Sequence, residues 1–197
     1  LPKTLIKKQA KELIPDKFEP DYINLLSIGR FSYAKNFDNV PDICKRIVEK
    51  GVNVKWYLLG YGGDEVLIRK KIDEAGMKDR VIILGKKENP YPYIKMCDVY
   101  VQPSRYEGKC VAVREAQMLG KPVIITNYAT SGSQLEDGVD GIIVPVDNKE
   151  CAEYMSKVLS DKTLICRITE KCLKRDYTNS WEIDKIYKLA NGIVCLN

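Results

Sequence analysis

Two glutamates are the side chains in this sequence best suited to bind a polar ligand. Glu107 and Glu115 are eight positions apart, and on one continuous helix that separation would turn the two side chains about 80° away from each other. If Glu107 lies in a loop and Glu115 in the helix that follows, both carboxylates can face one ligand. A sugar diol, with two hydroxyl donors, would satisfy a carboxylate whose burial is otherwise costly. The plain alternative is that Glu115 is a surface residue paired with Arg114 or Lys121.

Glycines and cations follow several short apolar runs of the chain. Glycine lets backbone approach a ligand closely, and free N–H groups at a helix start attract anions. Arg30 and Lys35 could add charge-assisted hydrogen bonds to a phosphate, each contributing about 1.5–3 kcal/mol. Alternatively, the glycines only turn the chain and the cations are solvated. The positions concerned are Gly29, Arg30 and Lys35 after the first run, Gly60 and Gly62 after the second, Gly85, Lys86 and Lys87 after the third, and Glu107, Gly108 and Lys109 after the fourth.

These positions come together if the apolar runs are parallel strands. Short apolar segments alternate with longer amphipathic ones, which predicts strands and helices in turn. Such a pattern indicates an α/β, Rossmann-like doubly wound parallel sheet with helices on both faces, and ligands of such sheets bind outside the carboxyl ends of the strands. The predicted strands are residues 23–28, 54–59, 81–84, 98–102, 122–126 and 141–144, and the predicted helices 38–50, 65–75, 111–119, 149–159, 162–175 and 181–189.

The composition excludes several classes of site. The 197 residues include no histidine, which removes His-based acid/base chemistry, Ser-His-Asp triads and His-ligated metals. Seven cysteines without a Cys-x-x-Cys pair suggest reduced thiols of a cytosolic protein. The net charge of +5 permits anionic ligands but does not argue for nucleic acid. No apolar run is long enough to span a membrane, and no signal peptide begins the chain.

Several motifs, in order along the chain, resemble those of one enzyme family. The stretch from Ser104 to Gly108, the seven residues between Glu107 and Glu115, and Gly120-Lys121-Pro122-Val123 resemble the E-x7-E region of the family 4 retaining glycosyltransferases, or glycosyl transferases group 1, of the GT-B fold. The likeness covers roughly residues 23 to 160 and implies the C-terminal, donor-binding domain alone. Further matches are Ser27-Ile28-Gly29-Arg30 with Lys35-Asn36, Leu59-Gly60-Tyr61-Gly62, Val81 to Gly85, Cys97 to Val101, and Asp137-Gly138 with Gly141 to Pro145.

The resemblance implies three parts of the chain. Residues 1–22 would be a linker segment or helix from the inter-domain region, and residues 23–175 the nucleotide-sugar-binding, Rossmann-like domain. Residues 176–197 would form a C-terminal helix that crosses back to an N-terminal acceptor domain absent from this sequence. The lysines near the start are compatible with peripheral membrane association, although such a charged stretch is usually a solvated face.

The resemblance also implies roles for single residues. Arg30 and Lys35 match the pair that grips the donor diphosphate, Glu115 the glutamate that binds the ribose hydroxyls, and Glu107 the one near the donor sugar. The loop at Gly85 to Lys87 matches the one that binds the base, largely through backbone. The expected catalytic residues are Glu107, Arg30 and Lys35, and the expected donor-binding residues are Gly29, Arg30, Lys35, Gly60, Gly62, Lys86, Glu107, Gly108, Lys109, Cys110 and Glu115, with backbone N–H groups of residues 108–110 donating to sugar or phosphate.

Two positions depart from the family pattern. Lys109 stands where an aromatic or apolar residue is usual, which alters sugar preference or adds a phosphate contact. Gln134 stands where the family has a glutamate, so a carboxylate role at that position is in doubt.

The implied activity is transfer of a hexose from a UDP- or GDP-sugar to a glycan or lipid-linked acceptor, with retention, in polysaccharide biosynthesis. No cofactor and no metal are expected, since the sequence has no Asp-x-Asp motif. The location would be cytoplasmic, at the inner face of the membrane, and half a cleft should bind donor without turnover. Two alternatives are half of a sugar-nucleotide epimerase, and a non-catalytic module that binds nucleotide regardless of the sugar.

Overall fold

The computed structural model describes residues 2–14 and 16–177, and within them the chain forms a parallel sheet. Its six strands run in the order β3-β2-β1-β4-β5-β6. The chain leaves β1 toward β2 on one side and leaves β4 toward β5 on the other. The switch point of this doubly wound sheet therefore lies between β1 and β4. The predicted α/β Rossmann-like fold is confirmed. The strands are β1 (Ile23–Ile28), β2 (Val54–Leu59), β3 (Val81–Gly85), β4 (Val99–Gln102), β5 (Val123–Thr126) and β6 (Ile142–Val144).

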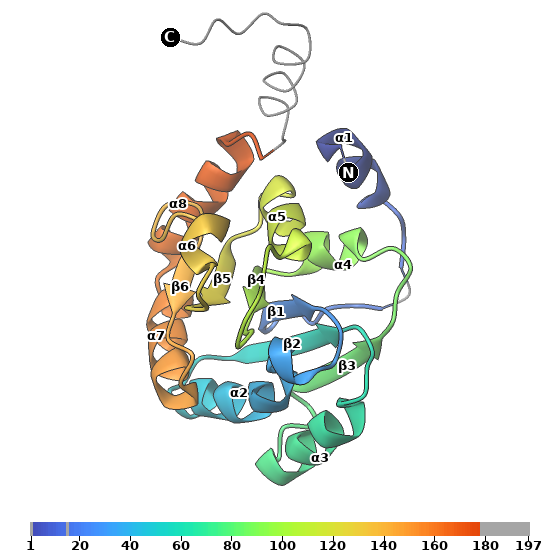
Figure 1. The fold of residues 1–197 in the computed structure, drawn as a ribbon, viewed down its shortest axis with the longest axis vertical. Helices are drawn as coiled ribbons and strands as arrows, with labels where there is room; N and C mark the ends of the chain where they lie inside the picture. The colour runs from blue at the N-terminus through green and yellow to red at the C-terminus, as the bar shows by residue number, and fades with distance from the viewer. Residues whose placement is uncertain (1, 15, 178–197) are drawn as a thin grey trace, which may run out of the picture.

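Helices cover both faces of the sheet (Figure 1). On one face α2 packs against α3 and α7, and on the other α1, α4 and α5 pack together. Helix α8 contacts both α7 and α5, so it lies where the two layers meet. The helices are α1 (Lys3–Gln9), α2 (Val40–Glu49), α3 (Glu65–Ala75), α4 (Tyr91–Met96), α5 (Val111–Met118), α6 (Ser131–Gln134), α7 (Asn148–Ser160) and α8 (Lys162–Lys174), with 3-10 turns at Tyr33–Lys35 and Phe37–Asn39.

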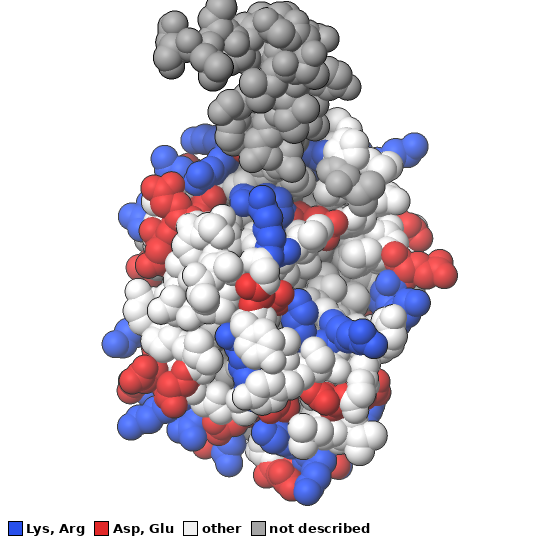
Figure 2. Space-filling view, viewed as in Figure 1, with Lys and Arg blue, Asp and Glu red and all other residues white. Residues whose placement is uncertain are grey.

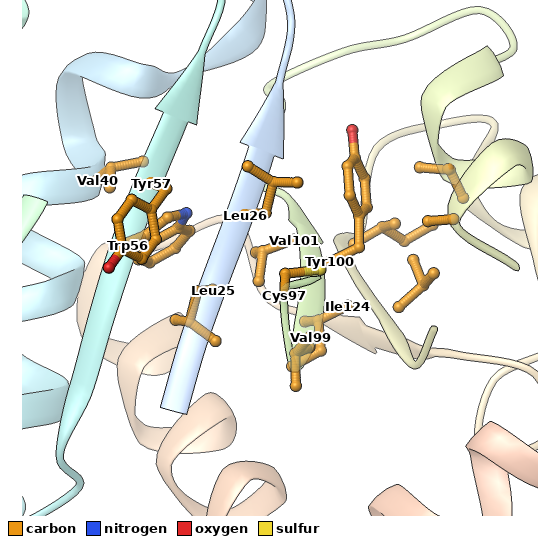
Figure 3. Packing of buried hydrophobic residues seen from close by; sticks show 14 of the residues in the cluster. Leu25, Leu26, Val40, Trp56, Tyr57, Cys97, Val99, Tyr100, Val101 and Ile124 are labelled. Atoms are coloured by element: carbon orange, nitrogen blue, oxygen red, sulfur yellow. The ribbon is translucent and has the colours of Figure 1, made fainter. Parts of the chain in front are cut away.

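The core lies on and between the central strands. Figure 3 shows Leu25 and Leu26 of β1 between the aromatic rings of β2 and the side chains of β4. One buried polar chain crosses this apolar centre: Trp56 Nε1 donates to Ser27 Oγ at 2.9 Å, and Ser27 Oγ donates to Val101 O at 2.6 Å. Since the indole N–H and the serine hydroxyl are both paired, their burial carries no penalty for an unmade hydrogen bond. These side-chain bonds also connect β2, β1 and β4 in addition to the backbone hydrogen bonds of the sheet.

The segment before β1 packs on the body of the domain. Ile6 and Ala10 are buried, and Phe18 stacks on Tyr57 with ring centroids 3.9 Å apart and planes 4° from parallel. Glu19 pairs with Lys55 of β2. Residues 2–14 and 16–22 are therefore attached to this domain by apolar and charged contacts, and the role of residues 1–22 as a linker stays a prediction.

The described helices α4 and α6 were not among the predicted ones. Pro90 and Pro92 oppose a helix at most positions, yet both lie at the start of α4, where a missing N–H costs nothing. The predicted helix at 181–189 lies outside the described residues. Among the described helices, none is long and apolar enough to cross a membrane.

Candidate functional site

A cleft opens at the carboxyl ends of β1, β2 and β3. Its volume is about 340 Å³. Of the residues predicted for the site, Gly29, Arg30, Gly60 and Lys86 line it. Figure 2 shows Lys and Arg side chains near the middle of one face of the molecule as well as around its edge. The remaining lining residues are Ile28, Leu59, Tyr61 and Lys87.

Glycines allow the two loops beside the cleft to lie in direct contact. A Cβ on Gly60, whose φ is +151°, would lie 1.9 Å from Gly29 O, and a Cβ on Gly62 would lie 2.2 Å from Phe31 O. Any side chain there would collide with backbone. Gly60 and Gly62 are thus required by packing, so this part of the glycine pattern needs no ligand to explain it.

The cations of the cleft differ in their partners. Arg30 is exposed, and no described residue forms an ion pair or a hydrogen bond with its guanidinium. Lys86 is exposed and lies over the ring of Tyr61, 5.2 Å from its centroid. Lys87 donates to Asp16 at 2.9 Å, so its charge is already paired. An anion that enters the cleft would meet Arg30 and Lys86 first.

Lys35 and Glu107 meet across the switch point of the sheet. Lys35 Nζ lies 2.5 Å from Glu107 Oε1, and the two side chains are 20% and 11% exposed. The lysine follows β1 and the glutamate follows β4, so the strand order brings together residues 72 positions apart. The stem of Lys35 passes over Gly29, where an added Cβ would lie 3.2 Å from Lys35 Cε. The pair therefore borders the cleft that Gly29 lines.

Hydrogen bonds from β4 and its loop hold the carboxylate of Glu107. Ser104 Oγ donates to Glu107 Oε1 at 2.7 Å, and Gln102 Nε2 donates to the same oxygen at 3.2 Å. Tyr100 OH in turn donates to Gln102 Oε1 at 2.8 Å, which orients that amide. The carboxylate is thus placed by a chain of polar groups that are themselves buried.

A second set of bonds joins the loop after β1 to the loop after β4. Arg105 donates to both carboxylate oxygens of Asp38 at 2.9 Å and to Tyr33 O at 2.6 Å. Burial opposes ionisation of Asp38, but hydrogen bonds and charge from Arg105 outweigh it and lower the pKa of Asp38. Asn36, in the left-handed conformation with φ 61°, donates to Pro103 O at 2.8 Å. Neither Arg105 nor Asp38 was predicted as a site residue. Their spacing in the sequence does not indicate that they pair, because the pair forms only when the fold brings the two loops together.

Glu115 lies in α5 and faces α4. Tyr91 OH donates to Glu115 Oε1 at 2.8 Å. Burial raises the pKa of Glu115, and the hydrogen bond from Tyr91 offsets part of that rise. Burial and the bond to Glu115 raise the pKa of Tyr91 to about 12. The surface alternative, a pair with Arg114 or Lys121, is wrong: Arg114 donates to Gln117 and Gln134, and Lys121 to Cys97 O.

The loop that follows Glu107 differs from the prediction at one amide. Cys110 N–H donates to Gln134 Oε1 at 2.9 Å, and Gln134 Nε2 donates back to Cys110 O at 3.2 Å. The N–H of Cys110 was expected to face sugar or phosphate, but here the Gln134 side chain occupies it. Gly108 and Lys109 are exposed, and their N–H groups form no hydrogen bond with a described residue.

Comparison with known proteins identifies the family. Residues 9–175 match the family model described as glycosyl transferases group 1, and the chain belongs to this family. It is 28% identical over 193 residues to an uncharacterized 41.2 kDa protein in the cps region of Klebsiella pneumoniae, covering 92% of this chain and 50% of that protein. It is 28% identical over 172 residues to the capsular polysaccharide biosynthesis glycosyltransferase CapM of Staphylococcus aureus, covering 81% of this chain and 44% of CapM. The chain thus spans half or less of these relatives.

A solved structure confirms the architecture. The crystal structure of HepE from Anabaena in complex with UDP superposes with a TM-score of 0.74 at 19% identity, covering 87% of this chain and 49% of HepE. At that identity the likeness concerns the fold, which is one half of a GT-B glycosyltransferase.

Proposed function

We propose that this chain is the donor-binding half of a retaining, metal-independent hexosyltransferase that uses a UDP- or GDP-sugar. The observation that carries the proposal is the Arg30 guanidinium, which has no partner among the described residues, in a cleft at the strand ends beside the Lys35–Glu107 pair. A diphosphate there would meet Arg30 and Lys86 and compete with Glu107 for Lys35. That HepE, whose fold this chain shares over 87% of its length, was solved in complex with UDP supports a nucleotide as the ligand.

Each carboxylate has a distinct part in this proposal. Glu115 accepts from the ribose hydroxyls in place of, or together with, Tyr91 OH. Glu107 accepts from a hydroxyl of the donor sugar, and the free N–H groups of Gly108 and Lys109 donate to sugar or phosphate oxygens. Two carboxylates on separate elements can then hold two ends of one ligand, as a nucleotide sugar requires.

Charge stabilisation of the leaving diphosphate is the chemical task of this half. Arg30 and Lys35 would stabilise negative charge as the glycosidic bond to the diphosphate breaks, which is the basis for proposing no metal. Retention would follow if the leaving phosphate takes the proton of the acceptor hydroxyl on the same face of the sugar. The acceptor, a growing polysaccharide or a lipid-linked sugar, would bind outside this chain.

The first test is ligand-induced thermal stabilisation with UDP, GDP and ADP. A ligand at about 100 times its dissociation constant stabilises by about 2.7 kcal/mol, or about 5–10 °C for a domain of this size. We expect one nucleotide to raise the Tm and Arg30→Ala to abolish the rise. Arg167→Ala, an exposed arginine of α8, changes the net charge equally and should leave the rise intact. Equal rises in both variants, or no rise with any nucleotide, would contradict the donor site.

The second test separates binding from transfer. The chain alone should bind a UDP- or GDP-sugar but transfer no sugar to an acceptor, because only half of the reacting geometry is present. A protein that includes the acceptor half should do both, with the anomeric configuration of the product read by NMR. An inverted product, or transfer by this chain alone, would contradict the proposal.

A further inference from the structure

Tyr128 carries a buried hydroxyl without a partner. The residue follows β5, is 2% exposed, and its OH forms no hydrogen bond with any described residue. A hydroxyl buried in this way destabilises a fold. Two other buried tyrosines have partners, since Tyr100 OH donates to Gln102 and Tyr177 OH to Asp140. The unpaired hydroxyl of Tyr128 therefore calls for an explanation.

The segment that contains Tyr128 supports the loop that contains Glu107. Thr130 Oγ1 donates to Glu107 O at 2.8 Å, and Gln134 exchanges two hydrogen bonds with Cys110. Burial raises the pKa of Tyr128, and the negative charge of Glu107 raises it further, so the hydroxyl keeps its proton at neutral pH. Tyr128 is thus a neutral hydrogen-bond donor on a segment that contacts the loop of Glu107.

The carboxylate of Glu107 is bonded through one oxygen. Lys35, Ser104 and Gln102 all donate to Oε1, and no hydrogen bond from a described residue reaches Oε2. Lys35 is the cation of this set. If a diphosphate draws the Lys35 ammonium away, Glu107 keeps its negative charge at 11% exposure and loses its cationic partner, which is unfavourable unless another donor replaces it.

We propose that Tyr128 is a positioning residue whose hydroxyl donates to the Glu107 carboxylate once the donor diphosphate has drawn Lys35 away. This inference rests on the proposed function. It gives the unpaired hydroxyl a partner in the complex, and it keeps Glu107 ionised and oriented toward the sugar. Donor binding thus exchanges one hydrogen-bond donor to Glu107 for another.

The test compares Tyr128→Phe with Tyr177→Phe, which removes a paired hydroxyl. We expect the Tm of Tyr128→Phe without ligand to be at least that of the wild type, because only an unpaired group is lost. Its affinity for UDP-glucose or GDP-mannose, measured by calorimetry, should fall about tenfold, equivalent to about 1.4 kcal/mol. Tyr177→Phe should show the opposite pattern, a lower Tm with unchanged affinity.

A spectroscopic measurement excludes a merely structural role. In protein with ¹³C at the ring Cζ of tyrosine, the signal missing from Tyr128→Phe belongs to Tyr128, and it should shift when the nucleotide sugar saturates the wild type. An unmoved signal, or equal affinity in Tyr128→Phe and the wild type, would overturn the inference while leaving the donor site intact. If the wild type binds neither nucleotide sugar, the proposed function itself fails, and the inference with it.

Discussion

Arg105 donates to both carboxylate oxygens of Asp38, each at 2.9 Å, and so ties the loop after β4 to the loop after β1. These loops carry Glu107 and Lys35. The Arg105 and Asp38 side chains are 17% and 10% exposed, a degree of burial at which removal of one partner leaves a poorly solvated charge. The pair is thus a structural condition for the contact between Lys35 and Glu107.

Loss of this pair should destabilise the fold. We expect Arg105→Ala to lower the free energy of unfolding by about 3 kcal/mol, because Asp38 keeps its charge with only the weaker contact to Lys71. Urea denaturation measures the change. Arg69→Ala breaks an exposed pair with Glu65 and should cost about 0.3–0.5 kcal/mol. Equal losses in the two variants would show that the Arg105–Asp38 pair has no special part.

Adjacent glycines should differ sharply in their tolerance of alanine. Gly62→Ala places a Cβ 2.2 Å from Phe31 O, whereas a Cβ on Gly63 meets nothing within 4 Å. We expect Gly62→Ala to destabilise by about 1–3 kcal/mol and Gly63→Ala to change stability by less than about 0.5 kcal/mol. Thermal unfolding compares the two, and similar Tm values would contradict the close packing of the loops.

Removal of the Gln134 side chain should loosen the loop after Glu107. Gln134→Ala leaves the N–H and the carbonyl of Cys110 without their partner, which costs about 1–3 kcal/mol. Ser133→Ala alters the exposed neighbour and should have a small effect. Hydrogen exchange at residues 108–110, compared between the two variants, measures the loosening directly; unchanged exchange in Gln134→Ala would count against this support.

Nucleotide binding should weaken at acid pH because of Glu115. Its folded-state pKa is raised, chiefly by burial, so stability without ligand declines as the pH rises through the interval between the unfolded and the folded pKa. Ribose hydroxyls donate more strongly to the ionised form, in which both carboxylate oxygens accept and carry charge. The affinity for the nucleotide should therefore fall as the pH drops through this raised pKa.

Calorimetry across the acid range measures that dependence. Glu115→Gln, which keeps the size of the side chain but cannot titrate, should bind more weakly and lose the part of the dependence due to Glu115. A wild-type profile identical in shape to that of Glu115→Gln would show that this carboxylate does not face the nucleotide.

The strands were predictable because each apolar run is a buried parallel strand. β1 and β2 begin and end where the sequence pattern places them, and the other strands agree to within about a residue. Helix α4 escaped prediction since Pro90 and Pro92 oppose a helix everywhere except at its start. Periodicity therefore predicted the strands and the long helices. It missed α4, where the effect of proline depends on its position in the helix, and α6, which has four residues and is too short to show a helical period.

The candidate site was predictable only in part. Arg30 and Glu115 were predicted from residue type and motif, and their roles stay predictions. The partners of Glu115 and Glu107 depend on which strands are neighbours and could not be predicted. Tyr91 and Gln102 carry no local signal of their roles. The hydroxyl of Tyr128 likewise could not be singled out from the sequence, because only the structure shows that it is buried and has no partner among the described residues.

The segment before β1 reaches the cation at the edge of the cleft. Asp16 accepts from Lys87 at 2.9 Å and from Tyr93 OH at 2.5 Å, and Asn89 donates to Gln9 O and Glu12. A nucleotide that draws on the charge of Lys87 and the docking of residues 2–22 must then influence each other by the same free energy. We expect displacement of this segment to change the affinity of the cleft for a nucleotide, and nucleotide binding to change how firmly the segment is held.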